Sequence, residues 1–275
     1  MNIILYLLNV VCASGQVTLS KVYSAKGGKA HIFDLNKAIA GIFVFLIMGL
    51  VSGMSFHIPT VFFGIGYGVF LGISMFTGFK ALKHGPMALT SIIASFSLII
   101  PFIFGITVWD ESITVYGVIG IILLLCAIVL LNFKSEKGIT VIWSVLVFST
   151  MVSNGVCSLI QKYHQLYFPK AYRIEFMIWS LLCVLIVTSI MGKSELKSFK
   201  FNFNGIVSGI LNGSANFIVL YLSATENASV LFPIVSVCNV VAVWLIGRIA
   251  FRERLKLIQA VGLIFGVVAV MLLSY

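Results

Sequence analysis

The stretch GIVSGILNGSANF, residues 205–217, has a glycine at every fourth position and ends with two asparagines four residues apart. Glycines at this spacing share one face of a helix and clear it of side chains, so another backbone can approach closely. An earlier stretch, GIGYGVFLG at 64–72, aligns with GIVSGILNG at 205–213 at a constant offset of 141 residues. We therefore predict two copies of one close-packed helix face. The glycines expected to pack are Gly64, Gly68 and Gly72 in the first copy and Gly205, Gly209 and Gly213 in the second.

The internal similarity continues beyond the glycines. At an offset of 142 the matching pairs are Leu89 with Leu231, Gly105 with Gly247, Glu111 with Glu253, Gly120 with Gly262, Ala127 with Ala269, Leu130 with Leu272 and Leu131 with Leu273. A slip of one residue between the two blocks corresponds to one insertion in a loop. We predict that residues 1–132 and 140–275 are two copies of one unit, joined by a connector at 133–139.

The composition is that of an integral membrane protein. The chain has 275 residues, of which 60% are hydrophobic and only 9% charged, and its mean hydropathy is +1.13. Soluble domains carry far more charge. Ten apolar runs have the length of a membrane-spanning helix, about 20 residues. They are 3–21, 38–56, 60–80, 86–109, 113–132, 140–161, 174–192, 204–222, 227–249 and 256–274.

Ten spans in two copies give five helices per copy. Because five is an odd number, the second copy enters the membrane from the opposite side, and the two halves form an inverted repeat. The predicted fold is therefore an all-α membrane protein with ten transmembrane helices in two inverted five-helix repeats. Transporters are built in this way, since two such halves can open a shared cavity to either side of the membrane.

The charged residues indicate topology instead of a nucleic-acid partner. The net charge is +10, but the 18 basic residues are spread over short connectors and form no single stripe. Fifteen of them fall in alternate connectors, starting with the first, which places both termini outside the cytoplasm by the positive-inside rule. The five cysteines lie inside apolar runs without CxxC spacing, so we expect neither disulfides nor a metal site.

Further motifs carry a resemblance to a known family. The fourth and ninth predicted helices start with the small-residue segments Gly85-Pro86-Met87-Ala88 and Glu226-Asn227-Ala228-Ser229, and Pro233 follows within the ninth. Both helices end at glutamate-containing turns, Trp109-Asp110-Glu111 and Arg252-Glu253-Arg254. Together with the duplication, these features resemble the EamA-type ten-helix transporters of the drug/metabolite transporter superfamily. The resemblance implies a central pathway lined by the first, third, fourth, sixth, eighth and ninth helices. It also implies cytoplasmic termini, contrary to the charge count.

Polar residues are concentrated on these helices. An amide in hydrocarbon costs several kcal/mol unless it finds a partner, and Asn212 and Asn216 lie on the glycine face, so both point inward. One interpretation is that such groups only join helices, at about 0.6 kcal/mol each. The other is that they bind a substrate. The predicted substrate-binding residues are Gln16, Ser91, Asn154, Ser158, Gln161, Asn212, Asn216 and Ser236.

Acidic residues are predicted to lie only at connectors and helix ends. Asp34 falls in the first connector, and Glu111 and Glu253 are interpreted as caps of the helices that follow them. Small multidrug resistance relatives use a carboxylate in the first helix, where this chain has Gln16. Proton-coupled extrusion of lipophilic cations by that mechanism is therefore not expected. No set of nucleophile, base and metal ligands is recognisable, so we expect no enzymatic activity, cofactor or metal.

These features predict a secondary transporter, an exporter or exchanger, of a small polar metabolite such as an amino acid. It would bind its substrate among neutral hydrogen-bonding groups and work by alternating access. The alternatives are a drug efflux transporter and a membrane scaffold or lipid-handling protein without transport. The expected partners are the substrate and the bilayer of a plasma or inner membrane, with no nucleic acid; a monomer is compatible with the sequence.

Overall fold

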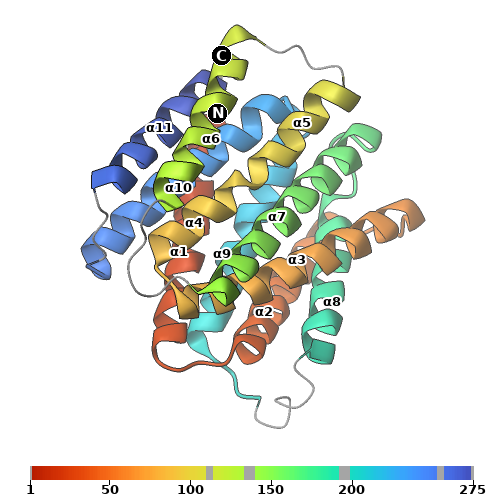
Figure 1. Cartoon of the computed structure of the whole chain (residues 1–275). Helices are drawn as coiled ribbons and strands as arrows, with labels where there is room; N and C mark the ends of the chain where they lie inside the picture. Colours follow the sequence, from red (N-terminus) through yellow and green to blue (C-terminus); the bar gives the residue numbers. More distant parts are fainter. Residues whose placement is uncertain (1, 110–113, 133–139, 192–198, 253–256, 274–275) are drawn as a thin grey trace.

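Every regular element in the described part of the protein is helical (Figure 1). The computed structural model describes residues 2–109, 114–132, 140–191, 199–252 and 257–273. The predicted connector 133–139 and the predicted caps Glu111 and Glu253 lie outside these residues. The helices are α1 (Asn2–Ala25), α2 (Ala30–Ser52), α3 (Ile58–His84), α4 (Met87–Ser95), the 3₁₀-helix η1 (Phe96–Leu98), α5 (Ile99–Val108), α6 (Val115–Asn132), α7 (Val141–Tyr167), α8 (Arg173–Met191), α9 (Phe203–Leu222), α10 (Ala228–Ala250) and α11 (Leu257–Leu273).

The helices have the length and apolar character of membrane spans. Among the described residues, seven are long and apolar enough to cross a bilayer, and one of these, Leu89–Val108, combines α4, η1 and α5. Shorter apolar helices occur at Ile234–Ala250 and Ala260–Ala269. Large apolar side chains such as Leu50, Phe62 and Val141 are exposed on the outer faces, as lipid contact requires. The all-helical, multi-pass class is thus confirmed, whereas ten spans in two inverted repeats stay a prediction.

The helices associate in a small number of close pairs (Figure 1). At one side of the molecule α6 packs along α11, and at the other α2 packs against α8. Between them α3 packs on α7 and α8, and α9 packs on α1 and α2. These contacts of α3 and α9 hold together the helices that carry most of the predicted substrate-binding residues.

Two of these pairings bring backbones into direct contact at the glycine stripes. A Cβ atom added at any of the six glycines would lie between 2.4 and 3.2 Å from an atom of a neighbouring helix. The closest approaches are Gly209 to the carbonyl oxygen of Lys37 on α2, and Gly68 to the carbonyl oxygen of Ser180 on α8, both at 2.4 Å. Only glycine fits such a contact without moving a helix. The remaining four glycines, Gly64, Gly72, Gly205 and Gly213, face the same two neighbours.

The second helix begins earlier than the sequence predicts. The apolar run suggests a helix at 38–56, but α2 starts at Ala30 and ends at Ser52. Its first two turns carry Asp34, Asn36 and Lys37, whose polar side chains favour a connector when the sequence is taken alone. All three side chains are buried against other helices, so they need not face lipid and the helix can include them.

Candidate functional site: a polar cavity among the helices

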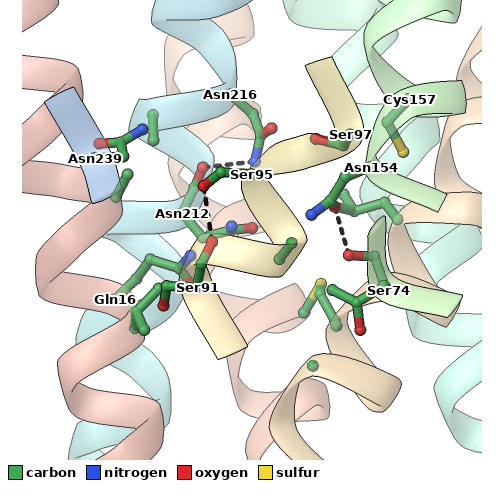
Figure 2. Close-up of a pocket in the computed structure, with 18 of the residues that line it drawn as sticks. Gln16, Ser74, Ser91, Ser95, Ser97, Asn154, Cys157, Asn212, Asn216 and Asn239 are labelled. Carbon is green, nitrogen blue, oxygen red and sulfur yellow. Dashed lines mark hydrogen bonds between the residues drawn. The ribbon is translucent and has the colours of Figure 1, made fainter. Parts of the chain in front are cut away.

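An internal cavity of about 300 Å³ lies among α1, α2, α3, α4, η1, α7, α9 and α10 (Figure 2). Its size is at the lower end of small-molecule sites and suits a ligand of about amino-acid size. The walls come from the helices that the family resemblance implies, and from α2 as well. All eight residues predicted to bind substrate line this cavity, although whether they bind one stays a prediction: Gln16, Ser91, Asn154, Ser158, Gln161, Asn212, Asn216 and Ser236.

One wall is a hydrogen-bonded group that joins three helices. The Tyr67 hydroxyl on α3 donates to Asn216 Oδ1 on α9 at 2.7 Å, and Gln161 Nε2 on α7 donates to that hydroxyl at 3.2 Å. Asn216 Nδ2 in turn donates to the backbone oxygen of Asn212 at 2.9 Å. Asn216 and Gln161 therefore hold helices together as well as facing the cavity. Tyr67 was not predicted, because in sequence it stands inside a glycine-rich apolar run without any polar neighbour.

A second hydrogen-bonded group in the cavity wall joins α3 and α7. Ser74 donates a hydrogen bond from its hydroxyl to Asn154 Oδ1, and Ser158 donates to the Asn154 backbone oxygen at 3.1 Å. In Figure 2 the amide nitrogen of Asn154 points away from Ser74 toward the middle of the cavity. A donor held in this way by its own oxygen is fixed in orientation and can meet a ligand acceptor without rearranging.

Further amides and hydroxyls stand on α1, α4 and α10. Asn9 donates from Nδ2 to the Ala215 backbone oxygen at 2.9 Å, and Asn239 donates to Asn9 Oδ1 at 3.4 Å. Asn239 Oδ1 is buried and has no hydrogen-bond partner among the described residues. On α4 the Ser95 hydroxyl donates to the Ser91 backbone oxygen at 2.8 Å. These groups make the cavity wall rich in both donors and acceptors.

The cavity also has charged residues, which corrects the prediction of a neutral site. Asp34 and Lys37 line it from α2, with side chains only 1% and 5% exposed. Lys37 Nζ donates to Gln16 Oε1 on α1 at 2.9 Å, whereas Asp34 Oδ2 has no hydrogen-bond partner in the described part of the chain. Asp34, predicted to fall in the first connector, lies in the second turn of α2, near the start of that helix. The spacing Asp-x-x-Lys, which puts both groups on one helix face, was the available signal.

Two lysines bind the ends of helices in matching ways. Lys21 on α1 donates from Nζ to the backbone oxygens of Leu82 at 2.9 Å and Gly85 at 2.8 Å, at the end of α3. Lys162 on α7 donates to the corresponding oxygens of Ser223 at 3.4 Å and Glu226 at 2.8 Å, at the end of α9. A cation suits the unpaired carbonyls of a helix C-terminus. All three pairs of positions are related by the offset of 141 that relates the glycine stripes.

The comparisons with known proteins agree with this architecture. The model of the EamA-like transporter family matches residues 1–133. This match over residues 1–133 supports the resemblance to the EamA-type transporters of the drug/metabolite transporter superfamily.

Among solved structures, one whose printed description is "Crystal structure of protein" matches with a TM-score of 0.70 and 15% sequence identity, covering 98% of this chain and 94% of the other. At this identity the likeness shows a shared fold and nothing about substrate. No curated protein matches the chain.

Proposed function

We propose that the protein moves a small polar or zwitterionic metabolite, such as an amino acid, across the membrane by alternating access. The observation that carries the proposal is the cavity of about 300 Å³, whose walls are rich in amides and hydroxyls. A cavity among membrane-spanning helices that is lined by amides and hydroxyls beside apolar side chains suits a small ligand that forms several hydrogen bonds. We infer no catalytic activity.

The proposal includes ten spans in two inverted halves, residues 1–132 and 140–275. In this arrangement α1, α2 and α3 of the first half correspond to α7, α8 and α9 of the second. The packing of α1 on α9 then corresponds to that of α7 on α3, and the packing of α2 on α9 corresponds to that of α8 on α3. In the pairs α2 with α8 and α6 with α11, each helix packs against its own counterpart in the other half. The two lysine caps obey the same correspondence. A structure that is nearly symmetric in this way supports two related conformations of similar free energy, as alternating access requires.

The glycine stripes mark where the halves would move. The contacts of α9 with α2 and of α3 with α8 each join one half to the other, and both are made through glycine. A face without side chains has no interlocking ridges, so sliding meets less steric hindrance there than at other helix contacts. Static close packing is the alternative for the same faces.

A binding screen followed by a flux assay tests the proposed function. A ligand that binds only the folded protein raises its apparent thermal stability. We expect one or more small polar metabolites from a panel of amino acids, sugars and nucleosides to stabilise the purified protein, and the same compounds to enter liposomes that contain it. Stabilisation by lipophilic drugs alone would instead favour drug efflux. A tightly bound lipid without any flux would favour a lipid-handling function.

A further inference from the structure

Asp34 and Lys37 are a costly feature that the fold itself does not require. Removing charged groups from water is expensive, and replacing a buried ion pair by apolar residues is often neutral or stabilising. The second half of the protein gives a direct comparison, because Gly209 contacts the Lys37 carbonyl oxygen just as Gly68 contacts that of Ser180. Lys37 therefore corresponds to Ser180.

The position corresponding to Asp34 is then Met177, three residues before Ser180. Met177 and Ser180 are fully buried on α8, and the Ser180 hydroxyl donates to a backbone oxygen of its own helix. The second half thus makes the same helix contact without any charge. Packing alone does not explain why the first half has a carboxylate and an ammonium group at these two positions.

Asp34 and Lys37 do not form a direct ion pair with each other. Lys37 Nζ is bonded to Gln16 Oε1, and in the described part of the chain no ion pair within 4 Å joins it to Asp34. Asp34 Oδ2 has no partner there although the side chain is 1% exposed and lines the cavity. Asp34 and Lys37 are three residues apart on α2, on one face of the helix. The cavity therefore offers one buried acceptor and one buried donor of opposite charge, close together.

We propose that Asp34, Lys37 and Gln16 form a charged subsite that selects zwitterionic substrates, with Asp34 accepting from the substrate's ammonium group and Lys37 donating to its carboxylate. The proposal rests on the proposed transport function and specifies its substrate class. A zwitterion satisfies both buried charges and leaves the net charge of the cavity unchanged. An amine or an acid of the same size satisfies only one of them and adds a net charge to the site.

The test uses two amino acids, each with its two single-charge analogues: valine with isobutylamine and isovalerate, and serine with ethanolamine and 3-hydroxypropionate. Binding to the purified full-length protein is measured by thermal stabilisation, and flux in liposomes. We expect wild type to prefer at least one amino acid over both of its analogues by roughly tenfold or more, since a hydrogen bond to a charged group contributes about 1.5–3 kcal/mol and 1.4 kcal/mol is a tenfold change in affinity.

The decisive variant copies the uncharged residues of the second half onto the first: Asp34→Met with Lys37→Ser. We expect it to fold with at least wild-type thermal stability and to lose the preference for the amino acid. Met177→Leu on α8 is the matched control and should keep the preference. The single changes should shift selectivity in opposite directions, Asp34→Asn toward the acid and Lys37→Met toward the amine, which a purely structural pair would not do.

Several results would overturn the proposal. They are wild-type selectivity in the double variant, a wild-type preference for a single-charge analogue, and a wild-type protein that responds to neither amino acid. Failure of the proposed transport function gives a different result from failure of the charged subsite. If the protein is not a transporter of polar metabolites, no sugar, nucleoside or amino acid of the wider panel crosses the liposome membrane. A protein that moves a sugar or a nucleoside but ignores both zwitterions would refute only the charged subsite.

Discussion

Gly209 lies where α9 and α2 touch backbone to backbone, and replacing it by alanine tests the packing between the halves. The added Cβ would lie 2.4 Å from the Lys37 carbonyl oxygen and 2.8 Å from Lys37 Cα. Ordinary van der Waals contact begins at 3.4 Å, so Gly209→Ala must separate the two helices by about 1 Å, the difference between 3.4 and 2.4 Å. Since the obstacle is backbone, no side-chain rotation relieves it.

The free energy of unfolding should fall by about 2 kcal/mol. Overpacking costs about 1–3 kcal/mol, and a rigid backbone obstacle belongs at the upper end. The higher helix propensity of alanine returns about 1 kcal/mol. Gly66→Ala is the control, because a Cβ there has its nearest neighbour, Ile160 Cδ1, at 3.8 Å. It keeps the gain in propensity without the clash, so the two variants should differ by about 3 kcal/mol.

Thermal unfolding in detergent measures this difference. It is monitored by the reaction of a thiol dye with the cysteines that unfolding exposes, Cys12, Cys157 and Cys183. Gly68→Ala should behave like Gly209→Ala, because its Cβ would lie 2.4 Å from the Ser180 carbonyl oxygen. The reasoning is refuted if Gly209→Ala unfolds at or above the temperature of Gly66→Ala.

Three further predictions concern the cavity, the helix ends and the topology. Asn212→Leu should reduce uptake into liposomes while the melting temperature of the empty protein changes little. Asn216→Leu should reduce uptake and also lower the free energy of unfolding by about 1 kcal/mol, because Asn216 Oδ1 accepts a hydrogen bond from the Tyr67 hydroxyl. Equal melting temperatures for the two would contradict this. Lys21→Met and Lys162→Met should each destabilise the protein by about 1.5–3 kcal/mol through lost bonds to helix-end carbonyls, and a neutral result at either site would show that its cap contributes nothing. A cysteine placed at Lys29 should resist a membrane-impermeant thiol reagent in intact cells, as the charge count places this connector in the cytoplasm; labelling would favour the opposite orientation.

The sequence was most informative where backbone geometry restricts residue choice. The glycines of 64–72 and 205–213 repeat with one spacing because a Cβ added at any of them would lie only 2.4–3.2 Å from an atom of the neighbouring helix. Such a constraint can be recognised in the sequence alone. The inward orientation of the polar side chains could be predicted for a different reason, because an amide that faces lipid finds no hydrogen-bond partner. All eight predicted site residues consequently line one cavity.

What could not be predicted depends on contacts between distant segments. The start of α2 was missed because Asp34 and Lys37 resemble loop residues until Gln16 and the cavity are placed beside them. Tyr67 was missed because its two hydrogen-bond partners lie 149 and 94 residues further along the chain. In the sequence Lys21 and Lys162 indicate only topology, because the fold alone brings them to the ends of α3 and α9.

The most direct test of the central claim, that the cavity is the transport site, is counterflow in liposomes loaded with the amino acid that stabilises the protein most. Wild type should accumulate the labelled amino acid from outside by exchange. Ser91→Ala should still exchange, although more slowly, because it removes one hydroxyl and leaves the cavity open. Ser91→Trp should fold but abolish exchange, because its indole ring would enter the cavity and take the place of the substrate. Exchange by Ser91→Trp at the wild-type rate, or no exchange by wild type, would contradict the claim.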